Sequence, residues 1–471
     1  MQQARQNITG RQAAPPGNTY QGTVRRPENQ KPIRGTVNRP APHGSVRGAN
    51  GAEASVASPG AAKRPLPANG GAVGKSKKKK EKSKNPNRIK FWNFEGRADF
   101  PMMAIILVLL TFGIIAMFSA GHALAYKEKD DSFYYIKHQL PAAGLGVVGM
   151  LALMLFDYRF LRHEFTTKKG RSFTLAHIIL GAMLILNTLC LPFGVSNQED
   201  GQKRWLRIPV FGTFQPSDLL KIAMIVFMAY YIHKHKDVIR KFEYGLLRPG
   251  LLFLVLVVIV FGIQTHLSAL LIMFMTCAVM LFVGGINMKP AVLAAVMAGL
   301  VIIVAIQFSD FSYFTERIQF MDPLSEPGDR SYQNYQSALA IGSGGIWGKG
   351  FGNSSQKYYY LPEAQNDFVF AIWVEEFGLI GGAIVILLFM VFIFRGFIIA
   401  RNAEDRFGSL LVTGITFQIG IQALLNIGVN LCCIPNTGIS LPFFSYGGTA
   451  LMIQLWEMGL LLSVSKRAKL K

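Results

Sequence analysis

Charged residues are scarce in this chain. Only 16% of the 471 residues are Asp, Glu, Lys or Arg, whereas 51% are hydrophobic and 35 are Phe. This composition argues against a string of ordinary water-soluble domains, in which about a quarter of the residues are charged. From Pro101 onward, apolar runs follow one another, each close to the roughly 20 residues that a helix needs to cross a bilayer. We therefore predict an all-α polytopic membrane protein.

Cysteine is almost absent. Its four positions, Cys190, Cys277, Cys432 and Cys433, lie in or beside apolar runs and have no metal-ligand spacing. This placement favours packing of free thiols over a zinc or redox site, and no metal ligands are assigned. No short apolar region with a cleavage site precedes the first apolar run, so no signal peptide is expected.

Large apolar side chains are few in the first 95 residues, which are rich in Gly, Pro, Ala, Asn, Gln and Arg. Such a segment cannot bury enough surface to offset its ordering entropy. We interpret 1–95 as a disordered tail and 96–471 as the membrane domain. The basic run KSKKKKEKSKNPNRIK, 75–90, is expected to stay in the cytoplasm and to contact anionic lipids. It lacks the interleaved aromatic residues that would favour nucleic acid as a partner.

Ten membrane spans are predicted, near 101–126, 137–156, 174–194, 218–232, 250–263, 267–285, 290–308, 367–394, 407–431 and 448–464. Basic residues gather in alternate loops, beginning with the tail and ending with the C-terminus. Cytoplasmic loops carry such an excess of Lys and Arg, so both termini are predicted to be cytoplasmic. The formal charge of +22 then describes orientation in a membrane rather than an acidic substrate.

This orientation sends the long segment 308–366, between the seventh and eighth spans, to the outer face with the loops 195–217 and 432–447. Loops of this length are uncommon in ordered proteins unless they are functional. The segment is rich in Gly, Tyr, Gln and Asn, and its glycine run, 342–352, suits a re-entrant turn or a backbone lying close to a ligand. We expect the functional site on this side.

Two outer stretches carry charged residues into apolar sequence. In GQKRWLRIPVFGTFQPSDLLK, 201–221, Arg204 and Trp205 precede a helix on which Asp218 lies one turn before Lys221. This pair either closes the helix end as an ion pair or lines a polar cavity. The stretch KYYYLPEAQNDFVFAIWVEEFG, 357–378, is more acidic and is considered next.

Four carboxylates lie at or inside the eighth span. Asp367 either caps the helix or serves as a catalytic carboxylate, and Glu363 either forms an ion pair within the loop or contacts substrate. Glu375 and Glu376 are adjacent and so point about 100° apart on a helix. We expect one to face a cavity, a role given to Glu376, and the other to face a basic partner.

A third outer stretch, PNTGISLPFFSYGGTAL, 435–451, has Pro and Gly interrupting apolar sequence. It is predicted to be a broken segment packed in protein. Ser445 invites interpretation as a nucleophile, but no His or Asp partner is recognisable nearby. Capping of backbone groups is therefore the favoured role of its hydroxyl.

Together these stretches resemble the SEDS family of FtsW, RodA and SpoVE. The similarity covers roughly 101–465 and rests on RW…FQPSDLLK, AIGSGGIWGKGFG…LPEAQNDFVFAIWVEEFG and PNTGISLPFFSYGG, in this order. The resemblance implies a peptidoglycan glycosyltransferase that polymerises lipid II at the outer face of the bacterial cytoplasmic membrane. It also implies a class B penicillin-binding protein as transpeptidase partner, together with other division proteins.

The chain departs from the family pattern at three places. Asp218 stands where the family usually has Glu, which shortens the side chain by one methylene. Residues 264–268, QTHLS, replace a Pro-Asp-Leu-Gly stretch, so any role of that missing Asp cannot be transferred. The usual His-Thr-Asp before the eighth span is Gln365, Asn366 and Asp367, which keeps the Asp.

The resemblance implies that Asp367 is catalytic, and the chemistry agrees. A sugar hydroxyl is a poor nucleophile, and a carboxylate acting as general base typically accelerates its attack by about 10²–10⁴-fold. Partial desolvation at the mouth of the span would raise the pKa of Asp367 toward neutral pH. With one base and no second nucleophile, inversion at the anomeric carbon is expected, by analogy with glycosidases.

The leaving polyprenyl diphosphate needs positive charge. Arg204 and Lys221 are the first candidates and Lys349 and Lys357 the further ones, with Mg²⁺ or Mn²⁺ as an open alternative and no cofactor firmly implied. The residues expected to bind substrate are Arg204, Trp205, Asp218, Lys221, Lys349, Lys357, Glu363, Glu376 and Ser445.

Two other functions stay open. A lipid II flippase would suit ten helices with broken segments, although it should carry charged groups along the whole crossing path. A non-catalytic scaffold that recruits a synthase is the second alternative. Within the family, QALLNIGVNLCCIPNTGISLP and the long basic tail favour a septal, FtsW-type role in division over RodA-type elongation.

Overall fold

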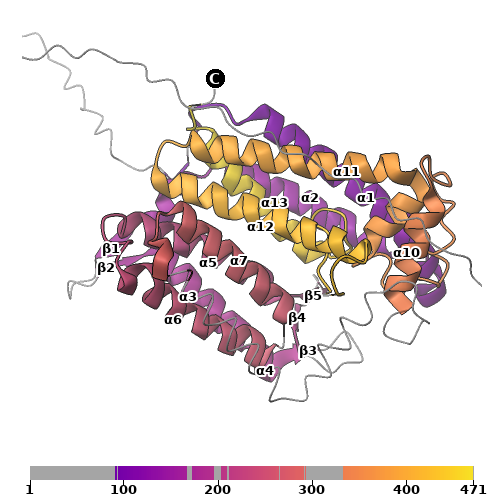
Figure 1. Cartoon of the computed structure of the whole chain (residues 1–471), viewed down its shortest axis with the longest axis horizontal. Helices are drawn as coiled ribbons and strands as arrows, with labels where there is room; N and C mark the ends of the chain where they lie inside the picture. Colours follow the sequence, from indigo (N-terminus) through magenta and orange to yellow (C-terminus); the bar gives the residue numbers. More distant parts are fainter. Residues whose placement is uncertain are drawn as a thin grey trace, which may run out of the picture. The chain divides into compact units, whose positions relative to one another are not determined.

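The computed structural model describes residues 91–92, 94–166, 172–195, 203–208, 212–264, 266–290, 292, 332–436 and 438–469. All of them belong to one compact unit, Ser83–Lys471. Predictions about most of the tail 1–95, the span near 290–308 and the first part of the loop 308–366 fall outside these residues. The described part consists mainly of helices (Figure 1).

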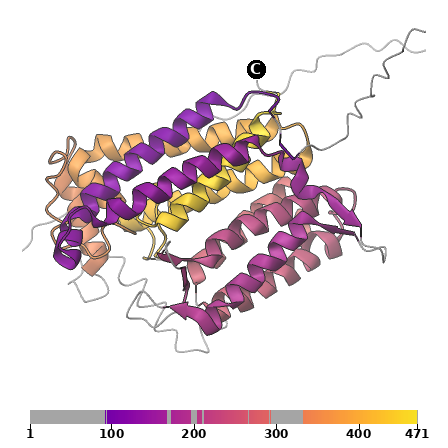
Figure 2. The same cartoon turned by 180° about the vertical axis from the view of Figure 1, so that it is seen from behind.

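Five long helices form the first group: α1 (Phe100–Lys129), α2 (Tyr134–Leu155), α11 (Val369–Arg401), α12 (Arg406–Asn430) and α13 (Gly448–Ser465). Helix α2 packs on α13, α1 packs on α2 and α11, and α11 packs on α12. Helix α10 (Tyr332–Gly344) packs against α11. Figures 1 and 2 show these helices side by side from opposite directions.

The second group contains α3 (Leu175–Thr188), the short α4 (Cys190–Phe193), α5 (Pro216–Lys234), α6 (Arg248–Leu256) and α7 (Leu267–Val283). Helix α6 is continuous with two π-helical segments, η2 (Glu243–Leu247) and η3 (Val257–Ile263). Helix α5 packs on α3 and α7, and α12 packs on both α5 and α7. Helix α12 therefore joins the two groups.

Short strands and one 3₁₀ helix connect these helices. The 3₁₀ helix η1 (Tyr158–Arg162) follows α2. An antiparallel pair, β1 (Glu164–Thr166) and β2 (Ser172–Thr174), leads into α3. A three-stranded antiparallel sheet in the order β3 (Gly194–Val195), β4 (Trp205–Ile208), β5 (Gly212–Phe214) precedes α5.

Among the described residues, seven helical segments are long and apolar enough to cross a membrane: Phe100–Lys129, Tyr134–Leu155, Leu175–Phe193, Glu243–Ile263, Val369–Arg401, Arg406–Asn430 and Gly448–Ser465. Each coincides with a predicted span. The predicted spans at 218–232 and 267–285 are also helical, but α5 and α7 are not among the seven. Helix α7 has only 17 residues, and α5 carries Asp218, Lys221 and Lys234.

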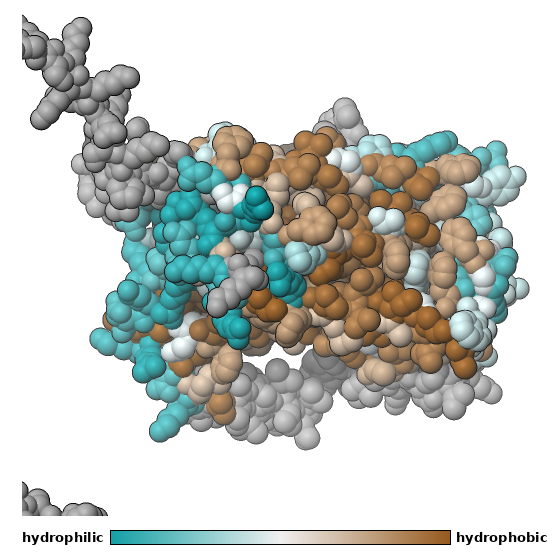
Figure 3. All heavy atoms as spheres, turned by 90° about the horizontal axis from the view of Figure 1, so that it is seen from above, coloured by the Kyte–Doolittle hydropathy of each residue, from teal (hydrophilic) through white to brown (hydrophobic). Residues whose placement is uncertain are grey.

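Apolar side chains cover much of the outer surface of these helices. Figure 3 shows a band of hydrophobic residues between hydrophilic ends on the face that it draws. On α11, Leu379 and Phe394 are 65% and 70% exposed. Large apolar surface of this extent is costly in water and favourable in lipid. The chain is a polytopic helical membrane protein, as its composition predicted.

Ion pairs fasten the helices at one end of the first group. Asp99, the N-cap of α1, accepts a hydrogen bond from the Met102 amide and pairs with Arg395 of α11 at 2.6 Å. The Tyr158 hydroxyl donates to Asp405, the N-cap of α12, at 2.7 Å. The opposite end, where α11 begins, carries the residues considered next.

Candidate active site

Asp367 lies two residues before α11 begins, and its backbone carbonyl is fixed by α12. The side-chain amides of Asn426 and Asn430 both donate to this carbonyl oxygen, at 2.7 and 2.9 Å. A carbonyl oxygen has two lone pairs, so these two donors saturate it. Both asparagines are buried. The main chain at Asp367 is thereby fastened to a helix that is distant in sequence.

The broken segment before α13 holds the two preceding residues. The Ser445 hydroxyl donates to the carbonyl of Asn366 at 2.6 Å, and the amide of Tyr446 donates to the carbonyl of Gln365 at 2.9 Å. Ser445 also accepts a hydrogen bond from the amide of Leu441 at 2.7 Å. The expected role of Ser445 in binding backbone groups is confirmed, and its hydroxyl is engaged on both sides.

The carboxylate of Asp367, unlike its backbone carbonyl, has no bonding partner among the described residues. The structure gives it neither a hydrogen bond nor an ion pair with any described residue, although the side chain is partly buried. Burial raises the pKa of Asp367 to about 7, and the nearby charge of Glu363 contributes to the rise. The N-cap of α11 is Phe368, and no side-chain capping bond is formed there. Capping by Asp367, the alternative to catalysis, is therefore wrong.

Two neighbours of Asp367 complete its surroundings. A Cβ atom placed on Gly438 would lie 3.6 Å from Oδ2 of Asp367, so the broken segment passes directly beside the carboxylate. Glu363 accepts hydrogen bonds from the side chains of Asn366 and Gln365. It forms no ion pair within the described ranges, which corrects the alternative of an ion pair in the loop.

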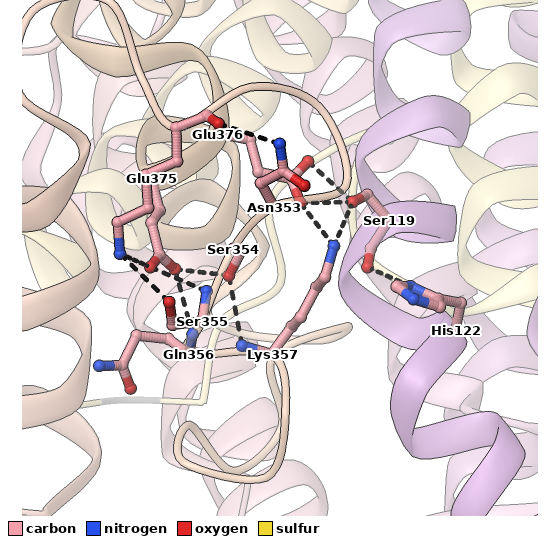
Figure 4. A network of polar contacts seen from close by, with 10 residues as sticks. Ser119, His122, Asn353, Ser354, Ser355, Gln356, Lys357, Glu375 and Glu376 are labelled. Carbon is pink, nitrogen blue, oxygen red and sulfur yellow. Dashed lines mark hydrogen bonds and ion pairs between the residues drawn. The ribbon is translucent and has the colours of Figure 1, made fainter.

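Glu375 and Glu376 both have lysine partners, and Figure 4 shows Lys357 beside Glu376. Glu376 pairs with Lys357 at 2.8 Å, and these side chains are 1% and 0% exposed. Ser119 of α1 donates to both oxygens of Glu376, at 2.6 and 2.7 Å. Glu375 pairs with Lys349 at 2.6 Å. The expectation that Glu376 faces a cavity is therefore wrong, because the protein interior encloses it in an ion pair.

Glu375 also receives donors from the loop that follows α10. The hydroxyl of Ser354 donates to one of its oxygens, and the amides of Ser355 and Gln356 donate to the carboxylate at 3.0 and 3.3 Å. The two carboxylates that looked out of place in an apolar span thus anchor the loop 349–357 to α11. Lys349 and Lys357 hold this loop in place through these pairs, and the cations that we assign to a diphosphate below come from a second cluster.

Glycine allows this loop to pass against α11. The amides of Lys349 and Gly350 donate to the carbonyls of Glu375 and Glu376, both at 3.0 Å. At Gly348, φ is +80° and a Cβ would lie 2.1 Å from the carbonyl oxygen of Glu376. No side chain fits there. The glycine run was predicted to form a re-entrant turn or to lie close to a ligand, and at Gly348 the group that it approaches is the backbone of α11.

A second polar cluster lies where α5 and α7 begin. Asp218 and Lys221 form the predicted ion pair at 2.9 Å, with both side chains largely buried. Ser217 and Gln215 contact Nδ1 of His266 at 3.3 and 3.0 Å. Burial and the charges of Arg204 and Lys221 lower the pKa of His266 to about 3, so the imidazole is neutral at pH 7.

Arg204 lies at the edge of this cluster, and Trp205 follows it in the chain. Nε of Arg204 donates to the carbonyl of Gln264 at 3.2 Å. Trp205 is the first residue of β4, is partly buried and pairs with Val195. The structure thus brings Arg204, Asp218 and Lys221 together around His266, a residue to which the sequence had given no role.

Helix α12 connects the two clusters through amides that were missed in the sequence. Gln418 donates to Glu457 of α13 at 2.8 Å, and Glu457 lies within electrostatic reach of Lys221 and Asp218. Gln422 donates to the carbonyl of Ser440 at 3.0 Å, and Asn426 and Asn430 follow at the same spacing. Residues four apart share a helix face, so TFQIGIQALLNIGVN already contained the signal.

A divalent cation would need a set of oxygen or nitrogen ligands. No group of three or more His, Cys, Asp or Glu residues is placed to hold a metal ion in the part of the chain that the structure describes. No protein ligand set for Mg²⁺ or Mn²⁺ is found there, and the chemistry below is derived from side chains alone.

Comparison with known sequences gives matches along the membrane part of the chain. A family model for FtsW, RodA and SpoVE, described as cell cycle protein, matches residues 100–470. The probable peptidoglycan glycosyltransferase FtsW of Geobacter sulfurreducens is 36% identical over 374 residues, covering 79% of this chain and 96% of the relative. Stage V sporulation protein E of Bacillus subtilis is 38% identical over 373 residues, covering 79% and 98%.

Solved structures share the fold. One chain of a peptidoglycan synthase complex has a TM-score of 0.62 at 24% identity, covering 78% of this chain and 97% of that chain. The rod shape determining protein RodA of Thermus thermophilus has a TM-score of 0.56 at 24% identity, covering 79% and 98%.

Proposed function

This chain belongs to the FtsW/RodA/SpoVE family, and we propose that it is a peptidoglycan glycosyltransferase that polymerises lipid II into glycan strands. The observation that carries the proposal is Asp367: its backbone is fastened by α12, while its carboxylate has no partner among the described residues. A carboxylate held in place but not neutralised suits a group that must accept a proton during a reaction.

Asp367 acts as general base in this proposal. The sugar hydroxyl of one lipid II molecule transfers its proton to the carboxylate as its oxygen attacks the anomeric carbon of the other chain. The bond from that carbon to the diphosphate oxygen breaks, and polyprenyl diphosphate leaves with the electron pair. With a pKa of about 7, Asp367 is substantially deprotonated at neutral pH and is still a useful base. A single displacement inverts the anomeric centre.

The leaving diphosphate is stabilised by the cluster at the start of α5. Arg204 and Lys221 supply positive charge, and Asp218 orients Lys221 through the ion pair at 2.9 Å. Fixed cations at a site of developing negative charge lower the barrier without reorganisation. Trp205, which follows Arg204 in the chain, contributes a flat apolar surface to the substrate.

The reaction takes place at the outer face of the cytoplasmic membrane. Ten spans, with both termini in the cytoplasm, put Asp367 and the loop 308–366 outside. Supporting this orientation, Arg159, Arg162, Arg401 and Arg406 all lie at the end of the helices opposite to Asp367, and such basic residues stay in the cytoplasm. The basic tail 75–90 would lie on the same side and contact anionic lipids.

The partner is a class B penicillin-binding protein that cross-links the new strands. The fold likeness to a chain of a peptidoglycan synthase complex supports this assignment. Similarity to proteins named FtsW, together with the long basic tail, favours synthesis at the division septum with other division proteins. RodA-type elongation is the alternative within the same chemistry.

Fluorescent lipid II and the full chain, purified together with its partner, test the proposal. Wild-type protein should make long glycan, and Asp367→Asn, which removes the base but keeps the shape, should make none. Asp131→Asn is the matched control, because Asp131 is a partly exposed aspartate in the loop between α1 and α2. Glycan synthesis by Asp367→Asn at the wild-type rate would refute the assignment. Movement of lipid II across vesicles without any glycan would indicate the flippase instead.

A further inference from the structure

The two asparagines that hold Asp367 connect more than one segment each. Asn426 donates from the same amide nitrogen to the carbonyls of Asp367 and Ile439, both at 2.7 Å. It therefore joins the loop before α11 to the broken segment that passes beside the carboxylate. A buried amide with both hydrogens used has no freedom to turn.

Asn430, one turn later on α12, likewise joins several segments through hydrogen bonds. Its amide nitrogen donates to the carbonyl of Asp367, and its Oδ1 accepts a hydrogen bond from the amide of Ala371 in the first turn of α11 at 3.0 Å. Its backbone carbonyl accepts from the hydroxyl of Ser337 on α10 at 2.8 Å. Helices α10, α11 and α12 thus meet at this one residue.

A packing role alone would explain why these amides are buried and satisfied, since buried polar groups almost always find partners. Two observations go further. Both amides converge on the carbonyl of a single residue, Asp367, and the carboxylate of that residue has no partner among the described residues. The amides of Gln418 and Gln422, on the same face of α12, contact other groups.

We propose that Asn426 and Asn430 are positioning residues for glycosyl transfer, which hold the main chain of Asp367 so that its carboxylate meets the acceptor hydroxyl. This inference rests on the proposed function. Displacing a reacting group by about 1 Å can cost about 10²-fold in rate. The asparagines act through Asp367 and do not touch the reacting atoms.

Asn430→Asp removes the donor of Asn430, which contacts Asp367 and also the carbonyl of Asn426 at 2.9 Å. The variant keeps Oδ1 for the amide of Ala371 but has no amide nitrogen to donate to Asp367. Asn402→Asp is the matched control, because Asn402 donates in the same way to the carbonyl of Ile398 at the far end of α11, at 2.8 Å. Both variants are made in the full chain with its partner and assayed with lipid II.

For Asn430→Asp we expect kcat to fall by about 10²-fold with KM nearly unchanged, whereas Asn402→Asp should resemble wild type. The pH dependence of kcat is the second measurement, because simple destabilisation of the fold would not shift it. Burial is the larger cause of the raised pKa of Asp367. Among the described residues, Glu363 is the charged group that raises this pKa further. In Asn426→Leu, which adds no charge near Asp367, a loosened carboxylate reaches water, so the acidic limb of kcat should move to lower pH.

Asn430→Gln and Asn426→Leu complete the design. The glutamine retains a donor, so it should recover part of the rate that Asn430→Asp loses, and Asn426→Leu should reproduce the loss. If Asn430→Asp and Asn426→Leu keep the wild-type kcat and pH profile while Asp367→Asn is inactive, the positioning role is wrong and the proposed function stands. If Asp367→Asn is active, the proposed function fails first. If Asn430→Asp does not fold, Asn430→Gln decides. A folded Asn430→Gln that is as inactive as Asp367→Asn, although it keeps a donor, overturns the inference.

Discussion

Substituting Gln for Glu376 should destabilise this protein strongly, although the side chain hardly changes shape. The carboxylate lies 2.8 Å from the ammonium of Lys357, and both side chains are almost completely enclosed. Gln keeps an acceptor for the hydroxyl of Ser119, but it leaves Lys357 charged in an interior without a counter-charge. Removing one partner of a buried pair typically costs about 3–5 kcal/mol.

The geometry gives a similar magnitude. Two unit charges separated by the observed 2.8 Å attract each other by about 6 kcal/mol at an effective dielectric constant of about 20. Lys357 keeps its hydrogen bond to Ser119, 3.3 Å away, so its ammonium is not left without any partner. A loss of a few kcal/mol is a large fraction of the stability of most proteins. It should therefore be visible as a much lower melting temperature.

The double variant Lys357→Met/Glu376→Gln separates structure from substrate binding. Removing both charges leaves no unpaired ion, and replacing a buried pair with neutral side chains is often neutral or stabilising. We expect the double variant to regain most of the melting temperature and most of the polymerase activity. If Lys357 bound the diphosphate, the double variant would instead be stable and inactive.

Thermal unfolding of the detergent-solubilised full chain and lipid II polymerisation are the assays. The pair Lys137–Asp131 provides the control, because it has a similar separation of 2.6 Å but its side chains are 62% and 35% exposed. Exposed pairs contribute little, so Asp131→Asn should barely change the melting temperature. A Glu376→Gln variant as stable as wild type, or a double variant with the summed loss of both single variants, would refute the reasoning.

Two further predictions concern the loops around Asp367. Glu363→Gln removes the charge that helps to raise the pKa of Asp367, so that pKa should fall. Because a general base works deprotonated, the acidic limb of the pH profile of kcat should move to lower pH, and an unmoved limb would contradict the assignment. Gly348→Ala places a Cβ 2.1 Å from a carbonyl oxygen of α11 at φ +80°, so the loop 349–357 should detach and become sensitive to protease. Gly342→Ala is its control, since a Cβ there meets nothing within 4 Å, and equal protease resistance of the two variants would argue against the glycine requirement.

The long helices were predictable from the sequence because lipid imposes a simple rule. A spanning segment must be helical, apolar and about 20 residues long, whatever its neighbours are. The span predicted at 101–126 is α1, Phe100–Lys129, and that predicted at 407–431 is α12, Arg406–Asn430. Boundaries agree within a few residues, since Asp99 and Asp405 cap these helices as aspartates commonly do.

The partners of Glu375 and Glu376 could not be predicted in the same way. Lys349 and Lys357 come before α11 in the sequence. The loop that follows α10 carries them back to Glu375 and Glu376 in the first turns of α11. That path depends on the approach of the Gly348 backbone to α11, which is a tertiary contact without a local signature. One of the two carboxylates was therefore expected to face a cavity and the other a basic partner, whereas the fold supplies a lysine to each.

Helix α12 relates the proposed base to the proposed diphosphate cations. Gln418 contacts Glu457, which is near Lys221, and Asn426 contacts Asp367 eight residues later. At 1.5 Å per residue, this spacing corresponds to roughly 12 Å along the helix axis. The four-residue spacing of the amides on one helix therefore relates the position of the proposed base to that of the proposed diphosphate cations.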